Sequence, residues 1–399
     1  MESLLGRNDN KQYEKEQKKH KIWVAVMVSI CTVTAISIFA YILNSIVNKH
    51  YTSYEVLLSN ERKDSNNVEY QQHEKGILKY SRDGATGIDI NGNILWNGSY
   101  DMNNPQADIC GNYIVIADIG GKEWYIYNGA NSGTKYEETL SIVQIQVSRQ
   151  GVVAVVLEDK DSNEIHIYNP YDTNQPLLAN IPTNLSEDGY PMDISISKDG
   201  KKIVTSYFSV VDGVGQSRVC FYNFDEVGQD KVNRIVGGEE FGNTLVHKVQ
   251  FINNEVVCIL TENGFTLYSM VELPEQIASE SFEKEIKSVM LGSDTIGFVL
   301  NGLEEEKKEL VLYNLNGKKT LTKKIDYKYD KVYISGEEII FLSDLEGIIL
   351  RNTGSEKLHS KFSKRMDYIF KVDEKNTYIF INETNIEKIK LTGGTPDDN

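Results

Sequence analysis

A short strand-like segment that ends in Tyr-Asn, or in a close variant, recurs along the chain and restricts the fold more than any other feature. The five clearest copies are Trp124–Asn128, Ile165–Asn169, Val219–Asn223, Phe265–Ser269 and Leu310–Asn314. Weaker copies end at residues 91, 352 and 391, so eight copies follow one another at spacings of 37 to 54 residues. Recurrence on this scale indicates a repeat architecture.

Each repeat except the last contains the signals of four short strands. A tight turn precedes most copies, as in Val147–Gly151 and Ile196–Gly200, and Asp, Asn and Gly supply the backbone conformations that close hairpins. A continuous apolar run follows the turn, as in Val152–Leu157, which is typical of a strand covered on both faces. Four strands in about 40–45 residues is the size of one β-propeller blade.

The sequence therefore predicts an all-β fold, a β-propeller whose eight units begin near residues 67, 106, 142, 191, 246, 286, 329 and 366. Seven blades remain the alternative, and two β-sandwiches are the rival architecture. The last unit supplies only three strands, so we expect Tyr54–Leu58 to add the fourth and close the ring. The repeated tyrosines are expected to pack between blades, and the asparagines to form the following turns.

An apolar segment, Ile22–Leu43, precedes the repeats and contains no charge, proline or glycine. As a helix its 22 residues would be about 33 Å long, which matches a hydrocarbon core of about 30 Å. Trp23 and Tyr41 stand near its ends, at the depth that such rings prefer. A cleavable signal peptide and a lipidated Cys31 are the alternatives to a transmembrane helix.

Basic residues lie on one side of this segment. Six precede it, whereas only Lys49 follows it before Arg62, so we expect the N-terminus in the cytoplasm and the large domain outside the cell membrane. The predicted organisation is a cytoplasmic tail (1–21), a transmembrane helix (22–47), an extracytoplasmic tether (48–66), a β-propeller (67–391) and a disordered tail (392–399).

Charge and cysteine content limit the partners. The net charge is −16, and because residues 1–21 carry six basic and four acidic groups, the rest carries −18. Such a domain repels nucleic acid. Cys110, Cys220 and Cys258 lie outside the span in no metal-type spacing, which leaves a Cys220–Cys258 bridge as the only minor possibility.

No catalytic constellation is present in the sequence, and we assign no catalytic, cofactor-binding or metal-binding residue. The six histidines are unpaired, and neither a G-x-S-x-G motif nor a phosphate loop occurs. Asp159–Glu164 places Asp159, Asp161 and Asn163 at alternate positions, but without the glycine and distal glutamate of a calcium loop it indicates a polar turn. The longest loops, Asn169–Asp193, Phe208–Arg218 and Asn223–Val246, mark the expected contact surface.

Several segments resemble an uncharacterised family of bacterial single-span membrane proteins with an extracytoplasmic β-propeller-like domain. They are the span 22–43, the hairpin Gly84–Trp96, the turn Ser195–Gly200 and the ending Ile389–Leu391. The Ser-Lys-Asp-Gly turn is also similar to turns of WD40-like and TolB-like propellers. The resemblance implies the architecture and no activity.

We therefore expect a membrane-anchored, non-enzymatic scaffold or sensor, inserted in the lipid bilayer through residues 22–47, that binds a protein or another envelope component through its propeller loops. The alternatives are a propeller enzyme acting on glycans or peptides, whose paired carboxylates the sequence cannot place, and a propeller that binds a small ligand or cofactor. The oligomeric state is left open.

Overall fold

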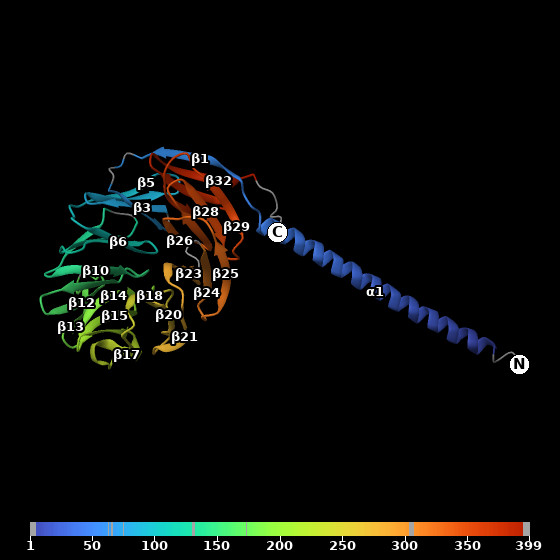
Figure 1. Ribbon diagram of the computed structural model, residues 1–399, viewed down its shortest axis with the longest axis horizontal. Coiled ribbons are helices and arrows are strands. Elements are labelled where there is room, and N and C mark those ends of the chain that lie inside the picture. Colours follow the sequence, from blue (N-terminus) through green and yellow to red (C-terminus); the bar gives the residue numbers. More distant parts are fainter. Residues whose placement is uncertain are drawn as a thin grey trace.

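The computed structural model describes residues 5–62, 64, 67–74, 76–129, 132–172, 174–302 and 307–393. Within these residues, one long helix, α1 (Leu5–Val47), precedes a ring of eight four-stranded antiparallel sheets (Figure 1). The predicted eight-bladed, all-β propeller behind an N-terminal helix is confirmed, and the seven-blade and two-sandwich alternatives are wrong. Parts of the predicted tails and tether, namely residues 1–4, 63, 65, 66 and 394–399, lie outside the described residues.

The strands of each blade follow one another in the sequence from the centre of the ring outwards. The first four blades consist of β2 (Glu69–His73), β3 (Gly76–Ser81), β4 (Gly84–Asp89) and β5 (Ile94–Ser99); β6 (Pro105–Cys110), β7 (Tyr113–Asp118), β8 (Glu123–Tyr127) and β9 (Thr134–Glu137); β10 (Ser141–Val147), β11 (Val153–Glu158), β12 (Ser162–Tyr168) and β13 (Leu177–Asn184); and β14 (Tyr190–Ile196), β15 (Lys202–Val211), β16 (Val214–Asn223) and β17 (Ile235–Gly242). Two short 3₁₀ helices, η1 (Glu226–Gly228) and η2 (Val232–Arg234), precede β17.

The other four blades follow the same order until the last one. They consist of β18 (Val246–Phe251), β19 (Val256–Thr261), β20 (Gly264–Ser269) and β21 (Glu275–Ser281); β22 (Ile286–Leu291), β23 (Thr295–Asn301), β24 (Lys308–Asn314) and β25 (Lys319–Ile325); β26 (Lys331–Ser335), β27 (Glu338–Leu342), β28 (Glu346–Arg351) and β29 (Glu356–Lys361); and β30 (Met366–Lys371), β31 (Thr377–Asn382), β32 (Asn385–Thr392) and β1 (Ser53–Glu61). Each predicted blade start lies within two residues of the start of an inner strand.

The two ends of the domain close the ring together. β1 comes directly after the helix segment and pairs with β32 from Ser53 opposite Thr392 to Glu61 opposite Asn385, so blue and red strands lie side by side in Figure 1. This confirms the expected closure by residues 54–58. The predicted tether range therefore contributes a complete strand to blade 8.

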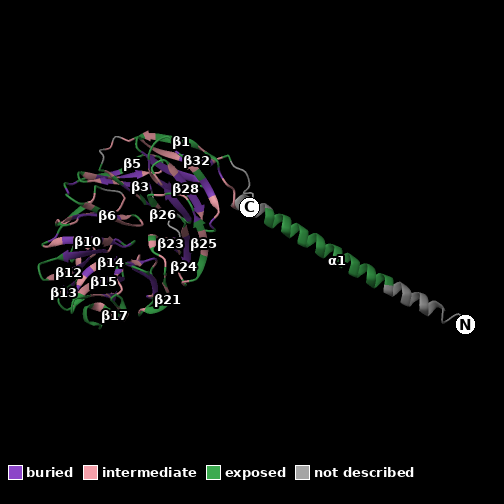
Figure 2. Cartoon of the chain, viewed as in Figure 1, coloured by how far each residue is buried: buried purple, intermediate pink, exposed green. Residues whose placement is uncertain are grey.

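The hydrophobic core of the ring lies between neighbouring blades. Eight hydrophobic clusters occur in the described residues, and each is shared by two adjacent blades, including the pair formed by blades 8 and 1. The second strands of the blades are mostly buried, the inner strands mix buried and half-buried residues, and the outer strands are largely exposed (Figure 2). A single blade cannot cover both of its faces, so the closed ring is the unit of stability.

The Tyr-Asn repeats have the structural role expected from the sequence. Tyr127, Tyr222 and Tyr313 are the last or next-to-last residues of the third strands of their blades and are at most 2% exposed. The Asn314 side chain accepts hydrogen bonds from the backbone N–H groups of Asn316 and Lys318 at 3.1 and 2.9 Å. These side chains pack neighbouring blades and close turns.

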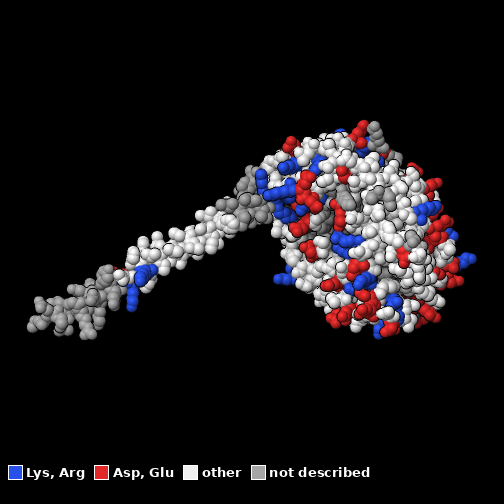
Figure 3. Space-filling view, turned by 180° about the vertical axis from the view of Figure 1, so that it is seen from behind, with Lys and Arg blue, Asp and Glu red and all other residues white. Residues whose placement is uncertain are grey.

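α1 contains the segment that is apolar enough to cross a membrane, with a mean hydropathy of 2.3 over an 18-residue window within Glu16–Tyr41. In Figure 3 this segment separates basic side chains from the propeller as a band without charge. The hydroxyls of Ser29, Thr32 and Ser37 donate to carbonyls one turn earlier at 2.8–2.9 Å, so they are satisfied without water. The length and composition of α1 fit a signal sequence as well as a span.

Candidate functional site

The propeller has two sides, which the strand directions define. The turns between the first and second strands of every blade, and those between the third and fourth, lie on one side because neighbouring strands are antiparallel. β1 begins opposite the end of β32, so α1 also reaches the ring on this side. We call it the anchor side, and the opposite side, with the turns between second and third strands, the distal side.

The residues after α1 are bound to the anchor side. The Tyr51 N–H donates to the Lys357 carbonyl at 2.8 Å, and the Tyr51 hydroxyl accepts from the Asn376 side chain at 2.7 Å. Arg351 donates to the Lys49 carbonyl, and Tyr51 is 8% exposed in the cluster between blades 7 and 8. Residues 49–51 are thus fixed to the ring by these contacts.

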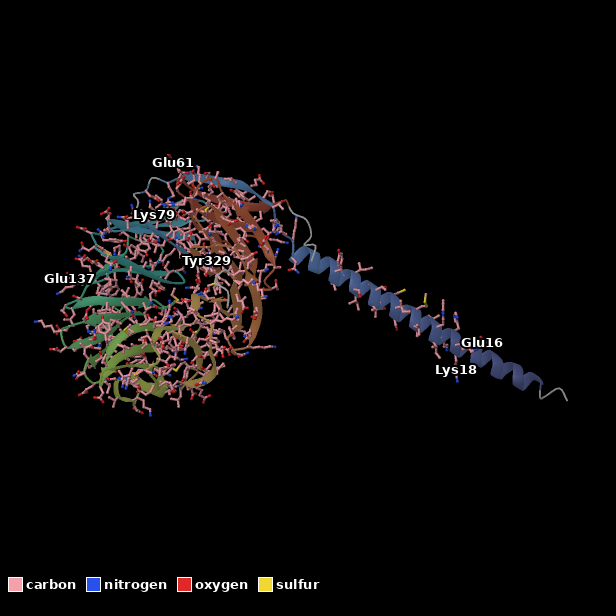
Figure 4. The ribbon with its side chains drawn as sticks, in the orientation of Figure 1. Glu16, Lys18, Glu61, Lys79, Glu137 and Tyr329 are labelled. Atoms are coloured by element: carbon pink, nitrogen blue, oxygen red, sulfur yellow. The ribbon has the colours of Figure 1, made fainter. Side chains whose placement is uncertain are left out.

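Two adjoining cavities occupy the anchor-side mouth of the central channel. The larger, of ≈ 920 Å³, is lined by turns of blades 1, 2, 3, 4, 7 and 8, and the smaller, of ≈ 560 Å³, by blades 4, 5, 6 and 7. Lys198, Ile334 and Gly336 line both. Figure 4 shows Tyr329 inside the ring, where its hydroxyl lies 2.9 Å from Ser288 Oγ, and Glu61 and Glu137 at the outer edge.

The two cavities differ in charge. In the larger one, Arg149 forms an ion pair with Glu74 at 2.5 Å, and Lys371 lies 3.4 Å from Glu338. The smaller cavity is lined by Lys198 and Lys248 and by no Asp or Glu among the described residues. Within those residues neither of these two ammonium groups forms a hydrogen bond or ion pair. The smaller cavity therefore presents two unpaired positive charges inside a domain of strongly negative net charge.

Two carboxylates of the channel wall join neighbouring blades. Asp108 on β6 accepts a hydrogen bond from the Val147 N–H of β10 at 2.7 Å, and Asp193 on β14 accepts one from the Val249 N–H of β18 at 2.8 Å. Burial in the narrow channel raises the pKa of each to about 6, although these hydrogen bonds and the nearby Lys248 act in the opposite direction. Each carboxylate holds the next blade in place.

Other inner-strand side chains make equivalent links. The Tyr333 hydroxyl on β26 accepts from the Ile369 N–H of β30 at 3.0 Å, and Ser335 Oγ accepts from the Lys371 N–H at 2.9 Å. Gln144 on β10 donates to the Met192 carbonyl of β14 at 2.8 Å. Asp108 and Asp193 thus belong to a series of structural contacts around the channel.

The most prominent feature of the distal side is the hairpin tip formed by residues 209–216 of β15 and β16. These residues pair only with each other, because β14 ends its pairing at Phe208 and β17 at Ser217. Asp212 and Gly213 have φ angles of 53° and 81°, which suits a two-residue turn that needs left-handed backbone. Val210 is 66% exposed and Val211 48%, so the tip presents apolar side chains to its surroundings.

Comparison with known proteins identifies the family. The profile of the family of unknown function DUF5711 matches residues 47–391. The protein belongs to the DUF5711 family. The matched range is the propeller with its closing strand, and it includes only the last residue of α1. A search of curated proteins finds no match.

Two solved structures with TM-scores above 0.5 share the fold of this DUF5711 protein. It is similar to a eukaryotic initiation factor at 13% identity and a TM-score of 0.54, over 86% of this chain and 88% of that one. Sqt1 of Chaetomium thermophilum, in a structure bound to the N-terminus of ribosomal protein L10, has 11% identity and a TM-score of 0.53, over 85% of this chain and all of its own. The WD40 domain of Pan2 from Neurospora crassa has 10% identity and a TM-score of 0.42, over 74% and 89% of the two chains.

The structure divides the three long loops of this DUF5711 protein between its two sides. Phe208–Arg218 forms the distal hairpin, whereas Asn169–Asp193 and Asn223–Val246 each contain an anchor-side turn, an outer strand and a distal connection. Asp159–Glu164 forms a hairpin turn in which Asn163 is buried and donates to the Leu157 carbonyl at 3.2 Å. Cys220 and Cys258 are buried free thiols, so no bridge joins them. No group of three or more His, Cys, Asp and Glu in the described part of the chain could hold a metal ion.

Sequence reasoning missed the channel-wall aspartates and the two lysines of the smaller cavity. A signal for the aspartates was present, because Asp-Ile recurs in the inner strands of blades 2 and 4 as Asp108-Ile109 and Asp193-Ile194. No comparable signal exists for Lys198 and Lys248. They come from a turn of blade 4 and a strand of blade 5, and only the closed ring brings them to one cavity.

Proposed function

We propose that the protein is a single-pass membrane protein whose extracytoplasmic propeller binds a protein partner through the β15–β16 hairpin tip and has no catalysis of its own. One observation carries this proposal: α1 reaches the ring on the anchor side, whereas the exposed valines of the tip project from the distal side. A protein held at the membrane by α1 would present this tip away from the bilayer.

The orientation rests on the residues that flank the span. Lys18, Lys19 and Lys21 precede the apolar part of α1, together with three further basic residues nearer the N-terminus. Basic residues next to a span remain in the cytoplasm, so the propeller belongs on the other side. The fold of the domain is compatible with protein recognition, since the similar propeller of Sqt1 is bound to the N-terminus of a ribosomal protein.

The apolar character of the hairpin tip favours it as the contact surface for a protein partner. Val210, Val211 and Val214 are 66%, 48% and 51% exposed on eight residues that project beyond the sheet. Exposed apolar groups on a projecting hairpin lower the free energy of a complex when a partner covers them. The proposal of no catalysis is supported by Asp108 and Asp193, whose carboxylates hold neighbouring blades.

Photo-crosslinking in intact cells tests the proposal. A benzophenone amino acid is placed at Val210, and a matched control carries it at Ile94, which is 68% exposed on the outer strand of blade 1. We expect position 210 to form a discrete adduct with one envelope protein, and position 94 to form none with that protein.

A charged variant, V210D/V211D/V214D, supplies the second arm of this experiment. It should lose the complex in a pull-down and keep the thermal unfolding midpoint of the native protein, because all three side chains are exposed. Equal capture of the partner by the native protein and the charged variant would show that the tip is not the contact surface. Protease added outside the cells tests the orientation separately, because in the proposed orientation it should remove the propeller before α1.

A further inference from the structure

The anchor side of the ring is held close to the end of the membrane-spanning segment. α1 continues as helix from Leu43, the last residue of the apolar segment, to Val47, a rise of about 6 Å at about 1.5 Å per residue. The next residues are already bound to the propeller, since Ser355 Oγ donates to the Asn48 side chain at 3.3 Å and Arg351 donates to the Lys49 carbonyl. In the proposed membrane-anchored state, the part of the anchor side formed by blades 7 and 8 stays close to the bilayer surface.

Exposed apolar side chains lie on the anchor side, across the ring from α1. Tyr171, Val232, Val271 and Leu273 belong to the turns between the third and fourth strands of blades 3, 4 and 5, and each is at least 45% exposed. Blade 4 stands opposite blade 8 in a ring of eight. α1 at blade 8 and these turns on the other half of the ring would support the propeller on the bilayer from both sides.

The smaller cavity opens on this same side and combines two kinds of lining. Lys198 and Lys248 supply unpaired ammonium groups, and their positive charge suits a phosphate group. The rest of the wall is mainly apolar and includes Phe251, Leu260 and Ile334. A volume of ≈ 560 Å³ accommodates a headgroup together with the glycerol region next to it.

We propose that this cavity binds the phosphate of an anionic membrane lipid, with Lys198 and Lys248 as its two cationic contacts. The ligand class follows from the charge of the two lysines, the apolar wall and the opening of the cavity on the side of the ring that α1 reaches. Asp108 and Asp193 also face Lys248, but each accepts a backbone hydrogen bond from the next blade and neither lines the cavity. Basic side chains also gather where α1 joins the ring (Figure 3), which suits an anionic lipid surface.

The test uses the full-length protein in detergent micelles and measures its thermal unfolding midpoint. Micelles contain either phosphatidylglycerol or phosphatidylcholine, and two further samples contain glycerol 3-phosphate or inorganic phosphate without lipid. A ligand that binds only the folded state raises the midpoint as its concentration rises above Kd. We expect phosphatidylglycerol to raise the midpoint more than phosphatidylcholine, and both soluble phosphates to have a smaller effect at equal concentration.

The variant K198Q/K248Q removes both charges and should weaken the apparent affinity for phosphatidylglycerol at least tenfold. The control K160Q/K324Q removes two exposed charges elsewhere and should bind as the native protein does. Circular dichroism in lipid-free micelles checks that both variants fold, as we expect because neither cavity lysine has a hydrogen bond or close ion pair to lose among the described residues.

Three outcomes would overturn the inference. They are equal stabilisation by the two lipids, unchanged affinity in K198Q/K248Q, and equal stabilisation by a soluble phosphate, which would assign the cavity to a free anion. The inference rests on the proposed membrane anchoring but not on the protein contact at the hairpin. Failure of crosslinking at Val210 therefore leaves the lipid result intact, whereas release of the protein from membranes by alkaline extraction would remove the anchoring itself.

Discussion

At the scale of single residues, the interface between blades 2 and 3 holds a histidine between two carboxylates. His166 Nε2 lies 2.7 Å from Glu164, and its Nδ1 lies 3.3 Å from Glu138, which also accepts hydrogen bonds from Trp124 and Tyr168. The hydrogen bond to Glu138 is the main cause that raises the His166 pKa above its ordinary value of 6.5, and Glu164 adds to it. This group contributes to stability as a cation.

Stability should therefore fall as pH rises through the neutral range. A raised pKa means that the folded state holds the His166 proton more tightly than the unfolded chain, so the contribution is complete below pH 6.5 and is lost above the folded pKa. We expect the free energy of unfolding to decrease over this pH range. Urea unfolding of the native protein and of H166Q measures it at several pH values. Equal pH slopes for the two proteins would refute the assignment.

At the scale of elements, β1 connects the helix to the ring and closes the last blade. Tyr54 packs its ring edge-on against Phe380 at 5.2 Å, and Arg62, just after β1, forms an ion pair with Asp367 at 2.6 Å. Without β1, the Ile389 and Leu391 side chains would lose the cover of their outer neighbour. The strand that follows the helix segment is therefore part of the folding unit.

Two truncated proteins separate this role from that of α1. A chain that begins at residue 48 retains β1 and should form a soluble propeller, whereas one that begins at residue 67 should unfold about 10 °C or more lower and aggregate through the open edge of β32. Thermal unfolding and size-exclusion chromatography of both chains measure the difference. Matching unfolding midpoints would mean that closure by β1 does not stabilise the ring.

The sequence pattern predicted the strands and turns of this fold better than the contacts between segments that are distant in the sequence. Blade starts and turns could be predicted because they depend on residues close together in the sequence. Hydrophobic alternation marks the strands, and Asn314 bonds to backbone groups only a few residues away. The pairing of β1 with β32 could be proposed only because the last unit lacked a strand. The convergence of Lys198 and Lys248 could not be predicted, since it depends on where the ring places separate blades.

At the scale of the whole molecule, α1, the cavities and the apolar turns share one side of the ring, and the hairpin tip lies on the other. In the proposed membrane-anchored state, this separation would let one domain contact a membrane and a protein at the same time without competition between the two surfaces. The net charge of −18 on residues 22–399 keeps the remaining surface from associating with an anionic bilayer. The proposed attachment would thereby be limited to the anchor side.

The orientation of the ring on the membrane is open to direct measurement. With Cys31 and Cys110 replaced by serine, a bimane label at V232C should be quenched by brominated lipids after reconstitution into vesicles, because the native side chain there is 82% exposed on the anchor side. A label at V211C, on the distal tip, should remain bright and be quenched by iodide in the surrounding solution instead. Equal quenching by brominated lipid at both positions would mean that the ring does not rest on its anchor side. The same result at V232C in vesicles of phosphatidylcholine alone would show that the apolar turns, and not the charge of the lipid, hold this side to the bilayer.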